Sequence, residues 1–234
     1  MNDESSPQPD RTDRTEFDAH AGSYEDDHKS SVAASGEDPA YFHDYKVSCL
    51  ERKGVDRDGP LLDFGCGIGN LTERFVGKYR EVHGYDPSRQ SIAHAKERAP
   101  GAKLHSDASA LPKAYFETAV MSGVLHHVQP SARVDLLRTV RGLLKPGGRL
   151  VVFEHNPLNP VTQRAVAACA FDDDAILLWP WEARGVLQAA GFDDVTLEYI
   201  VFFPRPLAFL RPLEPRLSGV MLGAQQMLVA TKPA

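Results

Sequence analysis

Cysteine is scarce in this chain of 234 residues. Cys49, Cys66 and Cys169 are widely spaced, and no C-x-x-C pair occurs. An odd number of cysteines without such a pair argues against a disulfide framework and against a cysteine-rich zinc site. We therefore expect three free thiols in a reducing compartment.

Long apolar runs and clusters of positive charge are also missing. No run reaches the roughly 18 apolar residues that a membrane-spanning helix needs. No apolar stretch follows basic residues near the N-terminus, so no signal peptide is expected. Lys and Arg number 26 against 32 Asp and Glu, and no Lys/Arg-rich run occurs. DNA and RNA are therefore not expected as substrates, and we expect a cytoplasmic protein.

The length and composition fit one globular domain, with 42% hydrophobic and 25% charged residues. Residues 1–15 are polar and charged, and we expect a disordered tail there. Residues 16–234 are predicted to form a single domain. Within it, residues 16–55 are predicted to form an N-terminal helical cap, and the apolar, Pro-rich residues 203–223 an insertion before the last strand.

Strand patterns alternate with helix patterns through the middle of the chain. This alternation predicts right-handed βαβ units and an α/β fold with a parallel sheet. The predicted strands are 61–64, 81–85, 103–106, 118–122 and 149–154, and the helices between them are 71–76, 88–98 and 132–144. Further along we expect helices at 157–170 and 181–190, a long β-type run at 192–203 and a last strand at 226–231.

The first predicted strand runs into a glycine-rich turn. Asp63 precedes three glycines at every second position, Gly65, Gly67 and Gly69. Such a turn has no Cβ atoms in the way and opens the N-terminus of a helix, so a nucleotide-like ligand can lie against bare backbone. The spacing is neither the G-x-G-x-x-G dinucleotide fingerprint nor a phosphate loop. An acid at position 63 would repel a diphosphate and favour an ammonium or sulfonium group.

Further motifs follow this turn in order. The second predicted strand ends at Asp86-Pro87, and the third is followed by Asp107-Ala108. The run MSGVLHHV, residues 121–128, spans the end of the fourth strand, and KPGG precedes the fifth. Together with the acid and glycine turn, these motifs resemble those of class I S-adenosylmethionine-dependent methyltransferases, in particular small-molecule enzymes such as those of ubiquinone and menaquinone biosynthesis.

The resemblance implies a fold and a cofactor. The fold is a Rossmann-like sheet of seven strands, mostly parallel with the last strand antiparallel, and with helices on both faces. The cofactor is S-adenosyl-L-methionine. The residues that the resemblance places at the cofactor are Tyr24, Asp63, Gly65, Cys66, Gly67, Gly69, Asp86, Pro87, Asp107, Ala108 and Ser122.

Three of these residues have roles implied by the resemblance. Asp86 would accept from the ribose hydroxyls, and Asp107 from the adenine amino group. Tyr24, in an F-D-x-x-A-x-x-Y element, would close over the methionine end of the cofactor. The alternatives are that Asp86 only caps a helix and that Tyr24 only packs a cap helix.

Histidines follow two neighbouring strands at their carboxyl ends. His126 and His127 come after the fourth strand, and His155 comes after the fifth, next to Glu154. Methyl transfer needs a base only when the acceptor loses a proton, and histidine suits that task near neutral pH. We predict these three histidines as catalytic candidates, with packing and capping as the alternative. Glu154 and His155 are alternatively expected to bind a hydroxyl of the acceptor.

No metal site is expected. Some members of the family that the chain resembles bind a divalent ion with acids near the fourth and fifth strands, and here Glu154 and the three consecutive acids Asp172 to Asp174 are available. The three consecutive acids cannot all face one point of a helix, so we expect them to cap the following helix or to face solvent.

The sequence therefore predicts a methyltransferase that acts on a small metabolite, with oxygen as the favoured acceptor atom. One alternative is a protein of the same fold that binds the cofactor without catalysis, as a regulator or partner subunit. Another is an NAD-dependent oxidoreductase. The insertion at 203–223, with Phe171, Trp179 and Trp181, is a candidate roof for an acceptor pocket, or else it only packs on the sheet. The acceptor and the oligomeric state stay open.

Overall fold

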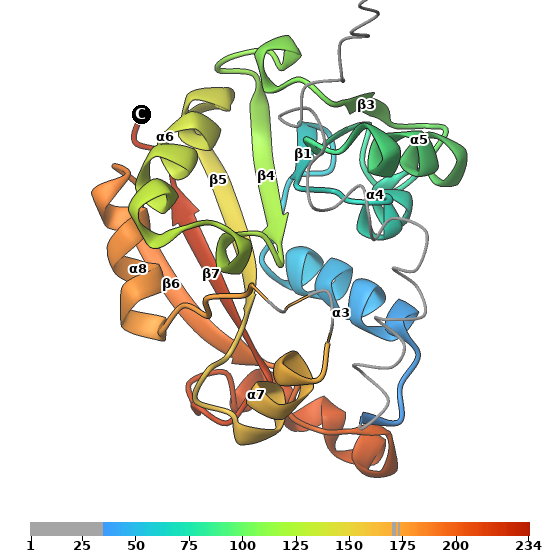
Figure 1. The fold of residues 1–234 in the computed structure, drawn as a ribbon, viewed down its shortest axis with the longest axis vertical. Helices are drawn as coiled ribbons and strands as arrows, with labels where there is room; N and C mark the ends of the chain where they lie inside the picture. The colour runs from blue at the N-terminus through green and yellow to red at the C-terminus, as the bar shows by residue number, and fades with distance from the viewer. Residues whose placement is uncertain (1–34, 170–171, 173) are drawn as a thin grey trace, which may run out of the picture.

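The computed structural model describes residues 35–169, 172 and 174–234 (Figure 1). The predicted tail, residues 16–34 of the predicted cap with Tyr24, and Phe171 lie outside the described residues. Within the described residues, no helix is long and apolar enough to cross a membrane.

One seven-stranded sheet forms the centre of the described structure, in the order β3-β2-β1-β4-β5-β7-β6. Its strands are β1 (Pro60–Phe64), β2 (Glu81–Tyr85), β3 (Lys103–His105), β4 (Phe116–Ser122), β5 (Leu144–His155), β6 (Asp193–Ile200) and β7 (Gln225–Thr231). The first five strands pair in parallel, and β7 runs antiparallel to both β5 and β6. The predicted fold class is confirmed.

Helices cover both faces of the sheet (Figure 1). They are α3 (Pro39–Arg52), α4 (Asn70–Phe75), α5 (Arg89–Arg98), α6 (Arg133–Leu143), α7 (Pro160–Ala167) and α8 (Pro180–Ala189). Short 3-10 helices are η3 (Ala108–Ala110), η4 (Leu125–His127), η5 (Pro130–Ala132) and η7 (Arg205–Arg216). Helices α6 and α8 lie on one side and α3, α4 and α5 on the other, which gives three layers.

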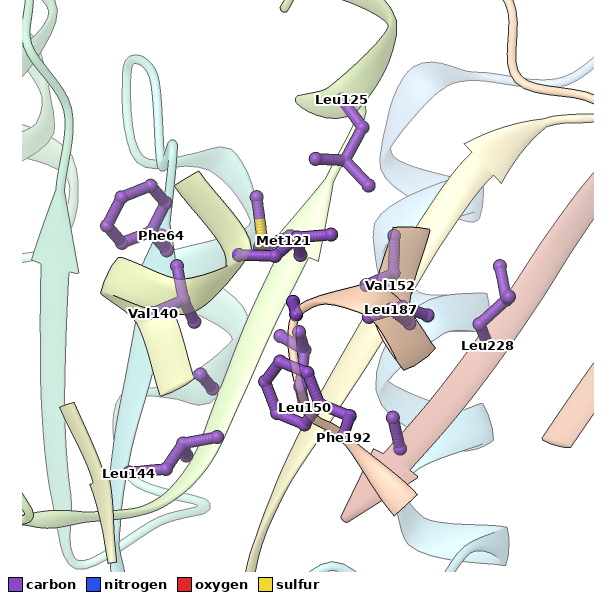
Figure 2. Close-up of a cluster of buried hydrophobic side chains, with 14 of the residues drawn as sticks. Phe64, Met121, Leu125, Val140, Leu144, Leu150, Val152, Leu187, Phe192 and Leu228 are labelled. Atoms are coloured by element: carbon purple, nitrogen blue, oxygen red, sulfur yellow. The ribbon is translucent and has the colours of Figure 1, made fainter. Parts of the chain in front are cut away.

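Two apolar cores hold these layers together because side chains alternate between the faces of each strand. On β1, Leu62 belongs to the core under α6 and α8, and Leu61 to the core under α3 and α4. Figure 2 shows the first core, in which Met121 of β4 and Val152 of β5 lie among side chains from α6 and α8. Leu61 and Leu62 are both fully buried.

Polar caps fix where several helices begin. The Ser88 hydroxyl accepts from the Ser91 N–H and starts α5, as the sequence predicts. The Asn159 side chain accepts from the N–H groups of Val161 and Thr162, so α7 begins at Pro160 and not at residue 157. The first N–H groups of a helix have no acceptor within the helix, and the Asn159 side chain supplies one for two of them.

The fifth strand begins earlier than predicted. The sequence predicts a strand from residue 149, after the motif KPGG. In the structure β5 starts at Leu144, directly after α6. The chain can extend there because Leu144 pairs with Phe116 and the Gly147 N–H donates to the Lys232 carbonyl at 2.9 Å.

The predicted insertion is the 3-10 segment η7 with its flanking loops. It is fixed by Glu214, which is 3% exposed. The Glu214 carboxylate accepts from the Tyr45 hydroxyl at 2.5 Å and from the N–H groups of Phe202 and Phe203, both at 3.1 Å. The segment is therefore joined to α3 and to the end of β6.

Candidate active site

The glycine turn between β1 and α4 has the left-handed backbone that favours glycine. The φ angles of Gly65, Gly67 and Gly69 are 80°, 52° and 85°. A Cβ added at Gly67 would meet nothing within 4 Å, whereas one added at Gly69 would lie 3.0 Å from the Cα of Ala95 on α5. Gly67 therefore presents bare backbone to open space, and Gly69 allows two helices to pack.

Two acids border this turn. Asp63 is 1% exposed, and its Oδ2 accepts from the Thr72 hydroxyl at 2.6 Å. Burial raises the pKa of Asp63 to about 7. At the end of β2, Asp86 Oδ2 accepts from the Gly67 N–H and Oδ1 from the Ser88 N–H, both at 2.9 Å. One carboxylate thus joins the turn to the start of α5.

A cavity of about 390 Å³ runs from this turn to the ends of β4 and β5. Its volume lies in the range of small-molecule sites. Most of the predicted site residues line it, namely Asp63, Gly65, Cys66, Gly67, Asp86, Pro87, Ser122, His126, His127 and His155.

The remaining predictions fall outside the cavity wall. Gly69, Asp107 and Ala108 do not border it. Asp107 is exposed, and its Oδ1 accepts from the Ser109 N–H at 2.8 Å at the start of η3. Its predicted contact with adenine stays a prediction, as does that of Tyr24.

The predicted roof is not part of the cavity. The side chains of Trp179 and Trp181 stack on each other with ring centroids 5.2 Å apart, and they are 42% and 65% exposed. Neither tryptophan lines the cavity, and no residue of η7 does. The roof interpretation is wrong for these parts because Glu214 holds η7 against α3 and β6 instead.

At the far end of the cavity, His126 is held by a buried carboxylate. Its Nδ1 lies 2.5 Å from Glu154 Oε2, and both side chains are 2% exposed or less. Glu154 Oε1 accepts from the N–H groups of Leu125 at 2.7 Å and Val124 at 3.2 Å. The carboxylate is thereby fixed on β5, and it fixes the imidazole on η4.

Asp172 faces all three predicted histidines. Its Oδ1 lies 3.5 Å from His126 Nε2 and 3.6 Å from His127 Nε2, and its Oδ2 lies 3.9 Å from His155 Nε2. Asp174 Oδ1 lies 3.1 Å from His127 Nδ1. The expectation that these acids cap a helix or face solvent is wrong for Asp172, whose side chain is 11% exposed.

These contacts give the histidines different proton affinities. Burial lowers the pKa of His126, but the Glu154 and Asp172 carboxylates outweigh it and raise the value to about 9. Burial lowers the pKa of His155 to about 4, with help from the neighbouring His126. Burial and His126 also lower the pKa of His127.

Two charged residues were missed by the sequence analysis. Lys46 of α3 lines the cavity, and its Nζ donates to the Ser122 hydroxyl at 2.7 Å. Burial lowers the pKa of Lys46 to about 8, although the carboxylates of Glu154 and Asp63 act against this. A lysine within an amphipathic helix gives no sequence signal for such a place.

The other missed residue is Arg133, which is fully buried at the start of α6. Its Nε donates to the carbonyls of Leu125 at 3.1 Å and Val128 at 3.0 Å. Its guanidinium also donates to the Ile176 carbonyl at 2.5 Å and pairs with Glu182 at 2.7 Å. Arg133 therefore joins the histidine loop to the segment that follows Asp174.

Comparisons with known proteins agree with this geometry. A methyltransferase domain family matches residues 62–150. The ubiquinone biosynthesis O-methyltransferase of Sinorhizobium fredii is 32% identical over 197 residues, which cover 72% of this chain and 75% of that protein. The trans-aconitate 2-methyltransferase of Methylobacterium nodulans is 35% identical over 150 residues, covering 61% of this chain and 54% of that protein.

Solved structures share the fold. A phosphoethanolamine N-methyltransferase of Haemonchus contortus, solved with S-adenosyl-L-methionine, superposes with a TM-score of 0.64 at 16% identity and covers 94% of this chain and 61% of that one. This chain belongs to the S-adenosylmethionine-dependent methyltransferase family. It spans 42%, 47% and 64% of the length of three other curated relatives that it matches, all uncharacterised methyltransferases.

Proposed function

We propose that this protein transfers a methyl group from S-adenosyl-L-methionine to an oxygen atom of a small-molecule acceptor. The observation that carries the proposal is one cavity that joins the glycine turn at Gly65 and Gly67 to the cluster of His126, His127 and His155. The glycine turn would hold the cofactor at one end of this cavity, and the histidines would face the acceptor at the other end.

The glycine end fits S-adenosyl-L-methionine, which supplies an electrophilic methyl group on a positively charged sulfur. The backbone of Gly67 leaves room for a ligand where any side chain would intrude. Asp86 lies at the carboxyl end of β2, where a carboxylate can accept from ribose hydroxyls. Asp63 is the buried acid that favours positive charge once it is ionised.

The histidine end is where the acceptor would lie. In-line transfer needs an acceptor oxygen aligned with the methyl group in a site that excludes water. A hydroxyl acceptor must also lose its proton, and the imidazole of His155 can accept it, because burial lowers its pKa to about 4 and the ring is therefore uncharged near neutral pH. The carboxylates of Glu154 and Asp174 hold the Nδ1 atoms of His126 and His127, and the Nε2 atoms of both rings face Asp172.

The names of two relatives support a small acceptor, since one acts in ubiquinone biosynthesis and the other on trans-aconitate. The acidic composition, with a net charge of -6, also disfavours a nucleic-acid acceptor. Oxygen is favoured as the acceptor atom because the cavity wall offers imidazoles and carboxylates that can accept the proton of a hydroxyl group.

The test begins with binding. Calorimetry should give a micromolar-range affinity for S-adenosylhomocysteine and no binding of NADH, whereas binding of NADH alone would point to an oxidoreductase. The protein is then incubated with methyl-labelled S-adenosyl-L-methionine and a panel of phenols, hydroxy acids and carboxylic acids. Label on an acceptor oxygen supports the proposal.

His155→Gln should strongly lower transfer to that acceptor while retaining cofactor binding. The control is His94→Gln, since His94 lies exposed on α5. Cofactor binding without transfer to any acceptor of the panel would instead identify a binding protein of the same fold.

A further inference from the structure

Three side chains at the acceptor end converge on one point. The ligand atoms of His126, His127 and Asp172 all lie within 4.8 Å of one another. The Asp172 Oδ1 is 3.5 Å from His126 Nε2 and 3.6 Å from His127 Nε2. A divalent ion bound at about 2.0–2.2 Å keeps neighbouring ligand atoms roughly 3.0–3.6 Å apart. The spacing therefore suits one shared ion.

Both imidazoles have a carboxylate on the nitrogen that points away from this point. Glu154 Oε2 lies 2.5 Å from His126 Nδ1, and Asp174 Oδ1 lies 3.1 Å from His127 Nδ1. Histidines that ligate metals usually have such an outer partner, which fixes the ring and directs the lone pair of the other nitrogen to the ion. Two adjacent histidines arranged in this way are harder to explain by packing alone.

The two loops that carry these ligands are fastened to each other. The Ile176 N–H donates to the His126 carbonyl at 2.7 Å, and Arg133 donates to the carbonyls of both Leu125 and Ile176. The convergence of Asp172 on the histidines thus rests on backbone contacts beyond the ligands themselves. A preformed site of this kind needs little rearrangement to bind an ion.

The charges also favour a cation. Glu154, Asp172 and Asp174 surround two imidazoles. The positively charged side chain of Lys46 lies nearby in the cavity wall, but it donates to Ser122. Two imidazoles with one carboxylate suit Zn²⁺, Co²⁺, Fe²⁺ or Mn²⁺ better than Mg²⁺ or Ca²⁺, which prefer oxygen alone.

We propose that His126 Nε2, His127 Nε2 and an Asp172 oxygen bind one divalent transition-metal ion, with His155 beside a further coordination position. The role of the ion rests on the proposed function. An acceptor hydroxyl that reaches an open position on the ion would have its pKa lowered, and the oxygen would be held in place for transfer. The metal site itself is inferred from the distances among His126, His127 and Asp172 and does not depend on that function.

Metal binding is measured directly on the full chain. The protein is stripped with a chelator, dialysed and titrated with Co²⁺, and the visible ligand-field absorption and the metal content are recorded. The wild type should bind one Co²⁺ per chain. Asp172→Asn and His127→Gln should each weaken binding at least about tenfold, since loss even of an outer-sphere partner costs about 10- to 100-fold.

Two exposed residues serve as matched controls, Asp135→Asn on α6 and His94→Gln on α5. Both should bind Co²⁺ like the wild type. The thermal midpoints of the metal-free variants are compared with that of metal-free wild type, so that unfolding is not mistaken for ligand loss. A wild type without stoichiometric Co²⁺, or an unchanged spectrum in folded Asp172→Asn, would overturn the inference.

The two proposals fail separately. Binding of S-adenosylhomocysteine and label transfer by chelator-stripped protein that takes up no Co²⁺ would remove the metal site and leave the methyltransferase function. Stoichiometric Co²⁺ binding that depends on Asp172, in a protein without affinity for S-adenosylhomocysteine, would remove the methyltransferase function and leave the metal site.

Discussion

Gly67 and Gly69 share a left-handed backbone but have different neighbours. Only Gly67 faces open space in the cavity wall, whereas Gly69 lies against α5. The sequence predicts the turn itself because three glycines at alternate positions are rare outside such bends. It cannot distinguish the glycine that meets a ligand from the glycine that meets a helix, since that depends on how α5 packs.

Alanine substitutions at Gly67 and Gly69 distinguish the glycine that meets a ligand from the glycine that packs against α5. Gly67→Ala should lower the free energy of unfolding by about 1–2 kcal/mol, the cost of a left-handed alanine, and should weaken S-adenosylhomocysteine binding. Gly69→Ala should cost more stability because its Cβ meets the Ala95 backbone. Gly77→Ala is the control, since Gly77 has φ 79° in open space outside the cavity wall. Urea denaturation and calorimetry measure both effects, and equal binding loss at Gly67 and Gly77 would contradict this account.

Asp63 predicts a pH dependence of cofactor affinity. Burial raises its pKa to about 7, so the carboxyl is increasingly ionised from about pH 6 to 8. Only the ionised form attracts the sulfonium and ammonium groups of S-adenosyl-L-methionine, so affinity should rise across this range. Calorimetry of Asp63→Asn should give a flatter and weaker profile. A wild-type profile identical to that of Asp63→Asn would show that Asp63 does not act in this way.

Without ligand, Asp63 gives the free energy of unfolding a pH dependence of the opposite sign. The folded pKa of Asp63 lies above that of an unfolded aspartate, so the unfolded chain loses this proton first as the pH rises. The Asp63 contribution to the free energy of unfolding is therefore fully present below about pH 4 and is lost as the pH rises towards 7. The difference in urea midpoint between wild type and Asp63→Asn, followed from acid to neutral pH, should show this trend.

At the level of elements, the sequence predicts strands and helices well where periodicity is local. The predicted strand at 81–85 is found as β2, and the helix predicted at 88–98 is found as α5, which Ser88 caps. Less was predictable for the segment after α7. Asp172 lies near the histidines because Arg133 and the Ile176 N–H hold the following residues to η4, contacts between residues far apart in sequence.

Arg133 is the strongest single support for this arrangement. Arg133→Met should lower the free energy of unfolding by about 3–5 kcal/mol, because it leaves buried carbonyls without donors and breaks a partly buried ion pair. Arg138→Met on the same helix is the control. Its exposed pair with Asp135 at 2.9 Å should contribute less than about 1 kcal/mol. Chemical denaturation compares them, and similar losses would contradict a special role for Arg133.

On the scale of the whole molecule, the order β3-β2-β1-β4-β5-β7-β6 brings the carboxyl ends of β1, β2, β4 and β5 to one edge. The resemblance to a known family predicted seven strands with the last one antiparallel, and local patterns alone give only the parallel alternation. Lys46 was beyond prediction for the same reason, because it reaches the site from a helix that precedes the sheet in sequence.

Strand β7 should be indispensable to folding. It pairs with β5 on one side and β6 on the other, and it buries Met227, Leu228 and Ala230. Removal of residues 225–234 should abolish the cooperative thermal transition, since this loss exceeds a typical stability of about 5–15 kcal/mol. Removal of residues 233–234 alone should leave the transition nearly unchanged. Circular dichroism measures both truncations, and a cooperative melt of the longer truncation would refute the expectation.

The place of β7 has a consequence for synthesis. Residues 225–231 emerge from the ribosome after every strand they join, so a growing chain holds the outer backbone groups of β5 unpaired until these residues arrive. Chaperone contact during translation is therefore expected to concentrate on β5, and the histidine end of the cavity beside it is completed last.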